Sequence, residues 1–497
     1  MSGAQERVEI PRWGELFSRA YARTTVGLVL LETLVAVQML VTVAVLPAVV
    51  DNLGGLRLYG VALSASGLAT AVALPVTARL VVRWGLRPVF LGSVLVFAVG
   101  TVVVIAAPNM PVFIAGRLAE GAAGGAQYAL MLAIFTRRYP QRLRPRMLAV
   151  WSTAWAVPGL IGPAYGGLVA STLGWRWAFG LLLPLLIPSV ILLQRDLDPG
   201  GPTAQQEVAP AAPAAGTGQP EPTPAGGAPA DGSPASWGWL LALGLGVALV
   251  LVSLALGSKW SLVVAVAGLV PAVLALREIL PQGSFTARPG LPAVIAVAFL
   301  ANVAFFAADG FLPAMLTGVR GVSLTFASVV LTLGTLAWVA GTWWQSRVVL
   351  RWSARRLVAL GAAMVLVGIV GVVLGDLGAP LLVPYLAWAV AGFGMGVAYP
   401  TITLLATDLA APGNEVVTLS QYQLAEALGA SVGPGLGGGA LSFALAAGLG
   451  LQDALLTGFI VAFVLGTLLL VASVRLRDPD VHRTEPADRG RPGPPRV

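Results

Sequence analysis

The chain has no cysteine, a single histidine and few charged residues. Without cysteine no disulfide can form, and thiols give no information on the redox compartment. Charged residues make up 10% of the 497 positions and hydrophobic residues 57%, which excludes an ordinary water-soluble core. His482 lies in a polar C-terminal tail, where we expect it to be solvated rather than to act as a ligand. The composition therefore predicts a membrane protein.

Long apolar segments follow one another along the chain, separated by short polar breaks. A helix needs roughly 20 apolar residues to cross the bilayer core. On this basis we predict an all-α polytopic membrane protein with about fourteen transmembrane helices. The predicted spans are 27–50, 57–82, 88–107, 111–136, 147–172, 176–194, 237–257, 260–277, 291–317, 325–346, 356–375, 380–406, 415–446 and 454–474.

The positive charges favour one orientation of these spans. With an even number of spans and a cytoplasmic N-terminus, Arg57, Arg176, Lys259 and Arg320 fall outside and Arg117 falls within a span, which leaves 25 of the 30 basic residues in the cytoplasm. This asymmetry follows the positive-inside rule. We therefore expect a multi-pass protein of the bacterial plasma membrane with both termini cytoplasmic. The net charge of +8 is explained by topology and anionic lipid, and no nucleic-acid partner is expected.

Composition also divides the chain into segments. Residues 195–236 are rich in Pro, Ala and Gly and predict a disordered linker, and the tail at 475–497 has the same character. We expect a cytoplasmic N-terminal segment at 1–26, a six-helix bundle at 27–194, two inserted helices at 237–277 and a second six-helix bundle at 291–474.

Several short motifs occur twice, in register. "LPA" at 46–48 returns at 312–314, and "ARLVVRWGLR" at 78–87 returns as "SRVVLRWSAR" at 346–355. A Gly-Pro motif also recurs with an offset of 271 residues. Its first copy contains Gly159, Gly162, Pro163, Gly166 and Gly167, and its second contains Gly433, Pro434, Gly437 and Gly438. The offsets predict two parallel six-helix repeats related by an axis along the membrane normal.

These features together resemble the major facilitator superfamily, and the two extra central helices resemble its fourteen-helix drug:proton antiporter branch. The loop between the second and third helices matches the family motif at Arg83, Gly85 and Arg87. The acidic residue of that motif is replaced by Val82, which puts the family's charge latch in question. In the family the Gly-Pro motif of the fifth helix marks antiporters. Glycines at this spacing allow two helices to pack closely. The motif therefore predicts either a tight contact along which the helices can slide during transport, or simple packing of neighbouring spans.

Positions that differ between the repeats are candidates for binding. Trp151 and Trp155 precede the first Gly-Pro motif, and Tyr422 and Glu426 occupy the equivalent positions before the second. Aromatic faces attract cations and supply apolar area, so these residues and Gln38 predict a cavity for a lipophilic or cationic small molecule. Alternatively, the two tryptophans face the lipid and do not line a binding site.

Ionisable residues within spans are costly, and they indicate function unless they are paired. Five were found, namely Glu32, Arg117, Glu120, Asp309 and Glu426. Arg117 and Glu120 are three residues apart and form either a structural pair or a proton site that the arginine tunes. Their segment resembles the fourth-helix motif of the family, in which the arginine is linked to proton transfer. Glu32, Glu120 and Glu426 are the favoured proton carriers, and Asp309 is a candidate outer gate or proton exit.

The sequence contains no nucleotide-binding loop, metal cluster or nucleophile and base pair that would predict an enzyme, a cofactor or a metal. We therefore predict a secondary transporter, in the first place a monomeric proton-coupled antiporter that exports lipophilic or cationic compounds. A proton-coupled uptake symporter and an exporter of lipids or envelope components remain as alternatives.

Overall fold

The computed structural model describes residues 13–140, 143–197, 236–256, 260–349, 351–410 and 415–476. These residues are almost entirely helical, and eleven of their helical segments are long and apolar enough to cross a membrane. The prediction of an all-α polytopic membrane protein is therefore confirmed. Helices α5, α8 and α9 also match the predicted spans 147–172, 237–257 and 260–277 to within three residues at each end, and the count of fourteen stays a prediction. The linker at 198–235 and the tail from 477 lie outside the described residues.

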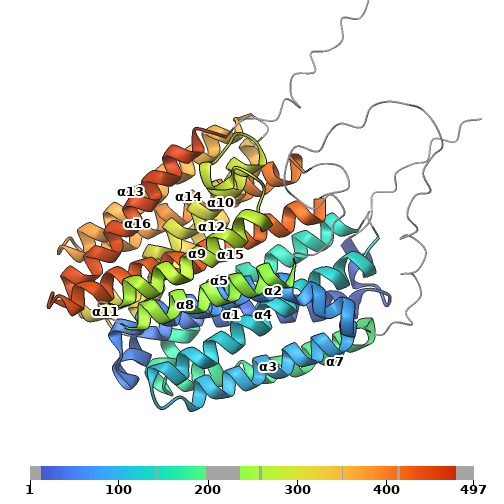
Figure 1. Cartoon of the computed structure of the whole chain (residues 1–497), viewed down its shortest axis with the longest axis horizontal. Coiled ribbons are helices and arrows are strands. Elements are labelled where there is room, and N and C mark those ends of the chain that lie inside the picture. The colour runs from blue at the N-terminus through green and yellow to red at the C-terminus, as the bar shows by residue number, and fades with distance from the viewer. Residues whose placement is uncertain are drawn as a thin grey trace, which may run out of the picture.

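The helices form two side-by-side groups, with the first helices of the chain on one side and the last on the other (Figure 1). The first group comprises α1 (Ala22–Leu53), α2 (Tyr59–Trp84), α3 (Leu86–Ala106), α4 (Met110–Arg138), α5 (Arg144–Thr172), α6 (Trp175–Gly180) and α7 (Leu186–Leu193). The second comprises α10 (Leu291–Asp309), α11 (Leu312–Gly318), α12 (Leu324–Val348), α13 (Ala354–Asp376), α14 (Leu382–Asp408), α15 (Glu415–Ala446) and α16 (Leu451–Ser473). Between them in sequence are α8 (Trp237–Leu256) and α9 (Ser261–Ile279). Short 3-10 turns occur at η1 (Trp13–Phe17), η2 (Leu56–Leu58), η3 (Leu183–Leu185), η4 (Gln194–Leu197) and η5 (Ser284–Thr286).

The two halves repeat the same packing. In the first half α1 packs on α5 and α4 packs on both α2 and α3, and in the second half α10 packs on α15 and α14 packs on both α12 and α13. Between the halves the main contacts are α2 with α15 and α5 with α12. The second helix of each half therefore meets the fifth helix of the other, which gives two equivalent seams.

Two of the predicted spans are interrupted. The span predicted at 176–194 breaks at Pro184 into α6, a 3-10 turn and α7. The span predicted at 291–317 breaks between Asp309 and Leu312, whereas the equivalent "LPA" segment at Pro47 continues through α1. Proline lacks the backbone N–H that the helix ladder needs. The second copy also has Gly310 just before the motif, and glycine weakens a helix further.

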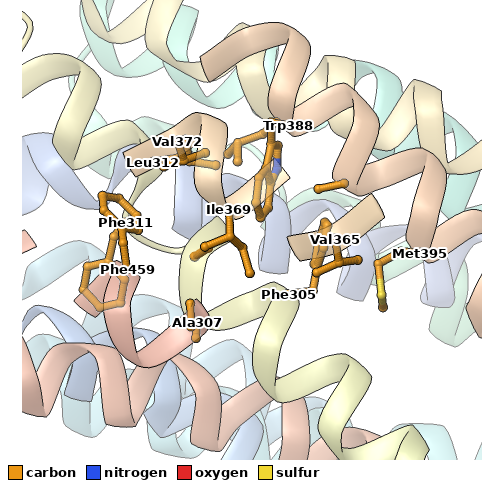
Figure 2. Close-up of a cluster of buried hydrophobic side chains, with 14 of the residues drawn as sticks. Phe305, Ala307, Phe311, Leu312, Val365, Ile369, Val372, Trp388, Met395 and Phe459 are labelled. Atoms are coloured by element: carbon orange, nitrogen blue, oxygen red, sulfur yellow. The ribbon is translucent and has the colours of Figure 1, made fainter. Parts of the chain in front are cut away.

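The core of the second half is built around one buried tryptophan. Trp388 on α14 stacks on Phe305 of α10 with ring centroids 4.7 Å apart, and both side chains are buried. Figure 2 shows this pair among Val365, Ile369 and Met395. Stacked aromatic rings contribute about 0.5–1.5 kcal/mol beyond the area that they bury. This cluster packs α10 against α14 one turn before Asp309, the polar residue at the end of α10.

The inserted pair α8 and α9 covers one of the seams. Buried side chains of α8 and α9 share an apolar cluster with α2 and α15, including Leu68, Leu243, Ala275 and Leu424. At the predicted cytoplasmic end, Gln421 Nε2 of α15 donates a hydrogen bond of 2.8 Å to the carbonyl of Ile279 at the end of α9. The two helices therefore contact both halves where these meet.

Candidate functional site

The two Gly-Pro motifs lie at equivalent places between three helices. In the first copy, Gly162 and Gly166 face α1, where an added Cβ would lie 3.4 Å from Leu40 and 3.3 Å from Val45 respectively. In the second copy, Gly433 and Gly437 face α10 in the same way. These four glycines therefore pack the fifth helix of each half against the first helix of that half.

The remaining glycines of the motifs face the opposite half. Gly167 would place a Cβ 2.6 Å from Ser328 Oγ of α12, and Gly159 faces Thr335 of the same helix. Gly438 lies directly against the backbone of Gly60 on α2, and the carbonyl of Pro434 also points at Gly60. The side chain of Pro163 lies outside the described residues. All these contacts are in the halves of the helices predicted to face outside. The α2–α15 seam is closed there backbone to backbone, and the α5–α12 seam is closed with only the small side chains of Ser328 and Thr335 between the helices.

A buried cluster surrounds Glu120 in the first half. Arg117 donates to Glu120 Oε2 at 2.6 Å, Thr101 Oγ1 donates to Oε1 at 2.7 Å, and Gln38 Nε2 also donates to Oε1. Arg117, Glu120 and Gln38 are each no more than 4% exposed. The structure therefore places Gln38, predicted as a cavity residue, beside Glu120. This carboxylate has donors on both oxygens.

Glu426 has a different environment. The hydroxyl groups of Tyr399 and Tyr422 lie beside its carboxylate, and Tyr422 also forms a hydrogen bond of 2.8 Å with Thr403. Oε1 of Glu426 is buried and has no hydrogen-bond partner among the described residues. An oxygen of this kind is costly when ionised, and it is well suited to accept a proton or to bind a polar group of a ligand.

Polar residues of the first half approach the same region. Glu32 on α1 is buried, and its carboxyl group is close enough to the hydroxyl groups of Tyr128 and Tyr399 to interact with them electrostatically. Gln423 Nε2 of α15 donates a hydrogen bond of 2.6 Å to the Tyr128 hydroxyl of α4, across the boundary between the halves. Glu32, Tyr128, Gln423, Tyr399 and Glu426 therefore form a central polar cluster to which both halves contribute.

Asp309 belongs to neither of these clusters. It lies at the end of α10 on the predicted outer side, is 7% exposed, and accepts a hydrogen bond of 3.0 Å from Trp388 Nε1. The ring of Tyr59 on α2 packs on Phe311 with centroids 5.3 Å apart. The Tyr59 hydroxyl is close enough to Asp309 for the two groups to interact electrostatically. The side chains of Trp151 and Trp155 lie outside the described residues.

The loop motif lies at the turn between α2 and α3. Gly85 has φ +82°, a conformation that favours glycine, and it separates the two helices. Arg83 and Arg87 are exposed on either side of it. The guanidinium of Arg79 lies over the ring of Trp237 at the start of α8, 5.1 Å from its centroid. The motif is therefore next to the inserted helices.

Three residues of the central polar cluster were not predicted, namely Tyr128, Gln423 and Tyr399. The proton-coupling residues predicted within spans were chosen because they are ionisable at neutral pH, whereas these three are neutral. Uncharged polar side chains within apolar spans are also enriched at functional and packing positions, because each needs a partner in the membrane. A count of Tyr and Gln within the predicted spans would have included them.

Comparison with known proteins identifies related sequences. The profile described as Major Facilitator Superfamily matches residues 28–434. A probable multidrug-efflux transporter of Mycobacterium tuberculosis is 36% identical over 201 residues, which cover 39% of this chain and 42% of that protein. The match thus spans about two fifths of the length of this relative. The multidrug transporter protein MdtP of Bacillus subtilis is 22% identical over 403 residues, which cover 78% of this chain and 69% of that protein.

Solved structures share the architecture. An auto-inhibited peptide transporter of the POT family superposes with a TM-score of 0.63 at 16% identity, over 93% of this chain and 99% of that one. A bacterial homologue of the human lysosomal transporter Spinster, inward-facing and unoccupied, gives a TM-score of 0.61 at 14% identity, over 92% of this chain and 98% of that one. At these identities the likeness establishes the fold.

Proposed function

The chain belongs to the major facilitator superfamily, and from this premise we propose that it is a secondary transporter that exports lipophilic or cationic small molecules in exchange for protons. The name of the Mycobacterium tuberculosis relative, a probable multidrug-efflux transporter, supports export as the direction, and the name of the Bacillus subtilis relative supports a range of drug-like substrates. We place the transporter in the plasma membrane as a monomer with both termini in the cytoplasm, in accordance with the distribution of its basic residues.

The observation that carries the coupling mechanism is Oε1 of Glu426, which is buried and has no hydrogen-bond partner in the part of the chain that the structure describes. A carboxyl group in this position is neutral when it holds a proton and requires a counter-charge when it does not. A lipophilic cation that enters the central polar cluster would supply that charge and release the proton. Tyr399 and Tyr422 would supply aromatic faces for the same cation. Glu426 is therefore the proposed exchange site, and Glu32 acts as the second acid of the cluster.

Glu120 has a different proposed role. It already accepts hydrogen bonds on both oxygens and lies against the guanidinium of Arg117. These contacts stabilise its ionised form, so we assign the pair to holding α4, α3 and α1 together. Asp309, which is bound to Trp388, is assigned to the outer end of α10 rather than to the central exchange step.

Alternating access would use the two equivalent seams. The outer ends of α2 and α15 touch backbone to backbone at Gly60 and Gly438, and those of α5 and α12 touch at Gly167 and Ser328. Without bulky side chains between them, these helix pairs can separate and close again without repacking. The inserted helices α8 and α9 contact both members of one pair and would move with it.

The test is substrate-driven proton movement in proteoliposomes that contain the full chain and a lipophilic fluorescent cation. For the wild type, addition of the cation should drive protons in the opposite direction. Glu426→Gln should abolish this movement while cation binding persists. Asp408→Asn, which neutralises an exposed acid at the end of α14, is the matched control and should behave as wild type.

Two results would contradict the proposal. If wild-type protein never couples the two movements, antiport is wrong, and accumulation of the cation together with protons would indicate the symporter instead. If Glu426→Gln couples as well as wild type, then another acid of the central polar cluster carries the proton, and Glu32→Gln becomes the decisive variant.

A further inference from the structure

A cavity of about 560 Å³ lies away from the central polar cluster, on the predicted cytoplasmic side of the second half. It is lined by residues 286–289 of the loop before α10, by Arg355 at the start of α13 and by residues 474–476 after α16. Small-molecule pockets commonly have volumes of about 300–1,000 Å³. The cavity is therefore large enough for the polar group of a ligand.

Three arginines converge on this cavity from three separate segments. Arg288, Arg355 and Arg475 line it, and none of its lining residues is acidic. Arg475 Nη1 donates a hydrogen bond of 2.5 Å to the carbonyl of Thr286, which fixes this side chain. Within the described ranges, the side chains of Arg288 and Arg355 form no hydrogen bond or ion pair, and both residues are exposed where they line the cavity. Positive charge without a neighbouring acid favours an anion.

The backbone adds to this preference. Helix α13 begins at Ala354, next to Arg355, and runs for 23 residues. The N-terminus of a helix carries partial positive charge and attracts anions, phosphate in particular. A general topology signal would require arginines on this side of the membrane, but it would not require three of them to line one cavity beside a helix start.

Exposed apolar side chains lie next to the same residues in the sequence. Phe285 is 54% exposed, Trp352 is 43% exposed and Val474 is 53% exposed. Aromatic residues at the level of the headgroups are typical of the membrane interface. A free phosphate ion would need only the arginines, whereas a lipid also needs apolar surface beside them.

We propose that this cavity binds the phosphate headgroup of an anionic phospholipid of the cytoplasmic leaflet, with its chains against Phe285, Trp352 and Val474. The guanidinium groups of Arg288 and Arg355 bind the phosphate oxygens, and Arg475 holds the loop before α10 in place. The bound lipid joins the ends of α13 and α16 to that loop. This proposal is independent of the substrate and of proton coupling.

The test measures lipid retained by the purified full chain with native mass spectrometry. Protein in detergent is exposed to phosphatidylglycerol, to phosphatidylcholine or to inorganic phosphate. Three proteins are compared: wild type, the double variant Arg288→Gln with Arg355→Gln, and the single variant Arg356→Gln. Arg356 is the matched control, because it is exposed one residue further along α13 and does not line the cavity. Far-ultraviolet circular dichroism and the Tm of each variant show whether it is folded.

Wild type and Arg356→Gln should retain phosphatidylglycerol in preference to phosphatidylcholine. The double variant should bind it roughly 25-fold more weakly, since each arginine at an anionic surface contributes a factor of about five. Equal retention by the double variant and wild type would overturn the proposal. If inorganic phosphate binds and phosphatidylglycerol cannot displace it, the ligand of this cavity is a free anion and the lipid proposal is overturned.

Discussion

The indole Nε1 of Trp388 donates a hydrogen bond of 3.0 Å to Oδ1 of Asp309, and both side chains are buried in the second half. This bond joins α14, less than two turns after its start at Leu382, to the end of α10. It also gives a membrane-embedded acid a partner that the sequence did not reveal, because 79 residues separate the two positions.

Replacement of Trp388 by Phe should therefore destabilise the protein chiefly through Asp309. The stack on Phe305 is largely kept, but a buried acceptor loses its donor, which costs about 1–3 kcal/mol. In an Asp309→Leu background the same replacement should cost less, since no acceptor remains. The free energy of unfolding in detergent for the four members of this cycle measures the coupling. Equal costs in both backgrounds would mean that the hydrogen bond contributes nothing.

Glu120→Gln should destabilise the first half strongly. It leaves the Arg117 guanidinium buried without a counter-charge, and breaking a buried pair in this way costs about 3–5 kcal/mol. Arg117→Met together with Glu120→Gln should recover most of that loss, because neither charge remains. Thermal unfolding of the two single variants and the double variant decides the matter. If Glu120→Gln is as stable as wild type but loses proton coupling, Glu120 is a proton carrier rather than a structural residue.

Gly60→Ala should disturb the outer seam. Its Cβ would collide with the Gly438 backbone, which cannot rotate away as a side chain can. We expect the outer ends of α2 and α15 to be forced apart and transport to fall at least roughly tenfold. Gly92→Ala is the control, since a Cβ at Gly92 in α3 meets nothing within 4 Å. That variant should transport normally and gain up to about 1 kcal/mol of helix stability. Equal transport by both variants would show that the seam tolerates a methyl group.

The sequence predicted much of this architecture because its signals are local or repeated. Apolar runs located the helices, and the offset of 271 residues placed Gly433, Gly437 and Gly438 where Gly162, Gly166 and Gly167 lie in the other half. Each copy of the motif faces the first helix of its own half and the second helix of the other. A single sequence contains both copies, so the symmetry can be read from it directly.

The partners across helices could not be read in the same way. The bonds from Gln38 to Glu120 and from Trp388 to Asp309 join positions 82 and 79 residues apart, and the approach of Gln423 to Tyr128 spans 295 residues. Such contacts depend on how each helix is rotated about its axis. A uniformly apolar helix does not specify that rotation, because its polar face is too weak. The placement of α8 and α9 over one seam was unpredictable for a related reason, since neither has a counterpart in the repeats.

The hydrogen bond from Gln423 to Tyr128 gives the last prediction. At 2.6 Å it joins α15 to α4 across the two halves on the predicted cytoplasmic side of the central polar cluster. Tyr128→Phe removes this acceptor. It should shift the equilibrium by about 0.5–1.5 kcal/mol away from the conformation in which α4 and α15 are joined at this hydrogen bond, and toward the one in which their cytoplasmic ends separate. Distances between spin labels at the predicted cytoplasmic ends of α4 and α15 would report the shift. Tyr165→Phe removes the hydroxyl that lies 3.3 Å from the carbonyl of Ala178 within one half, so it should leave those distances unchanged. A shift of the same size in both variants would mean that loss of a hydroxyl, rather than of a contact between the halves, causes the effect.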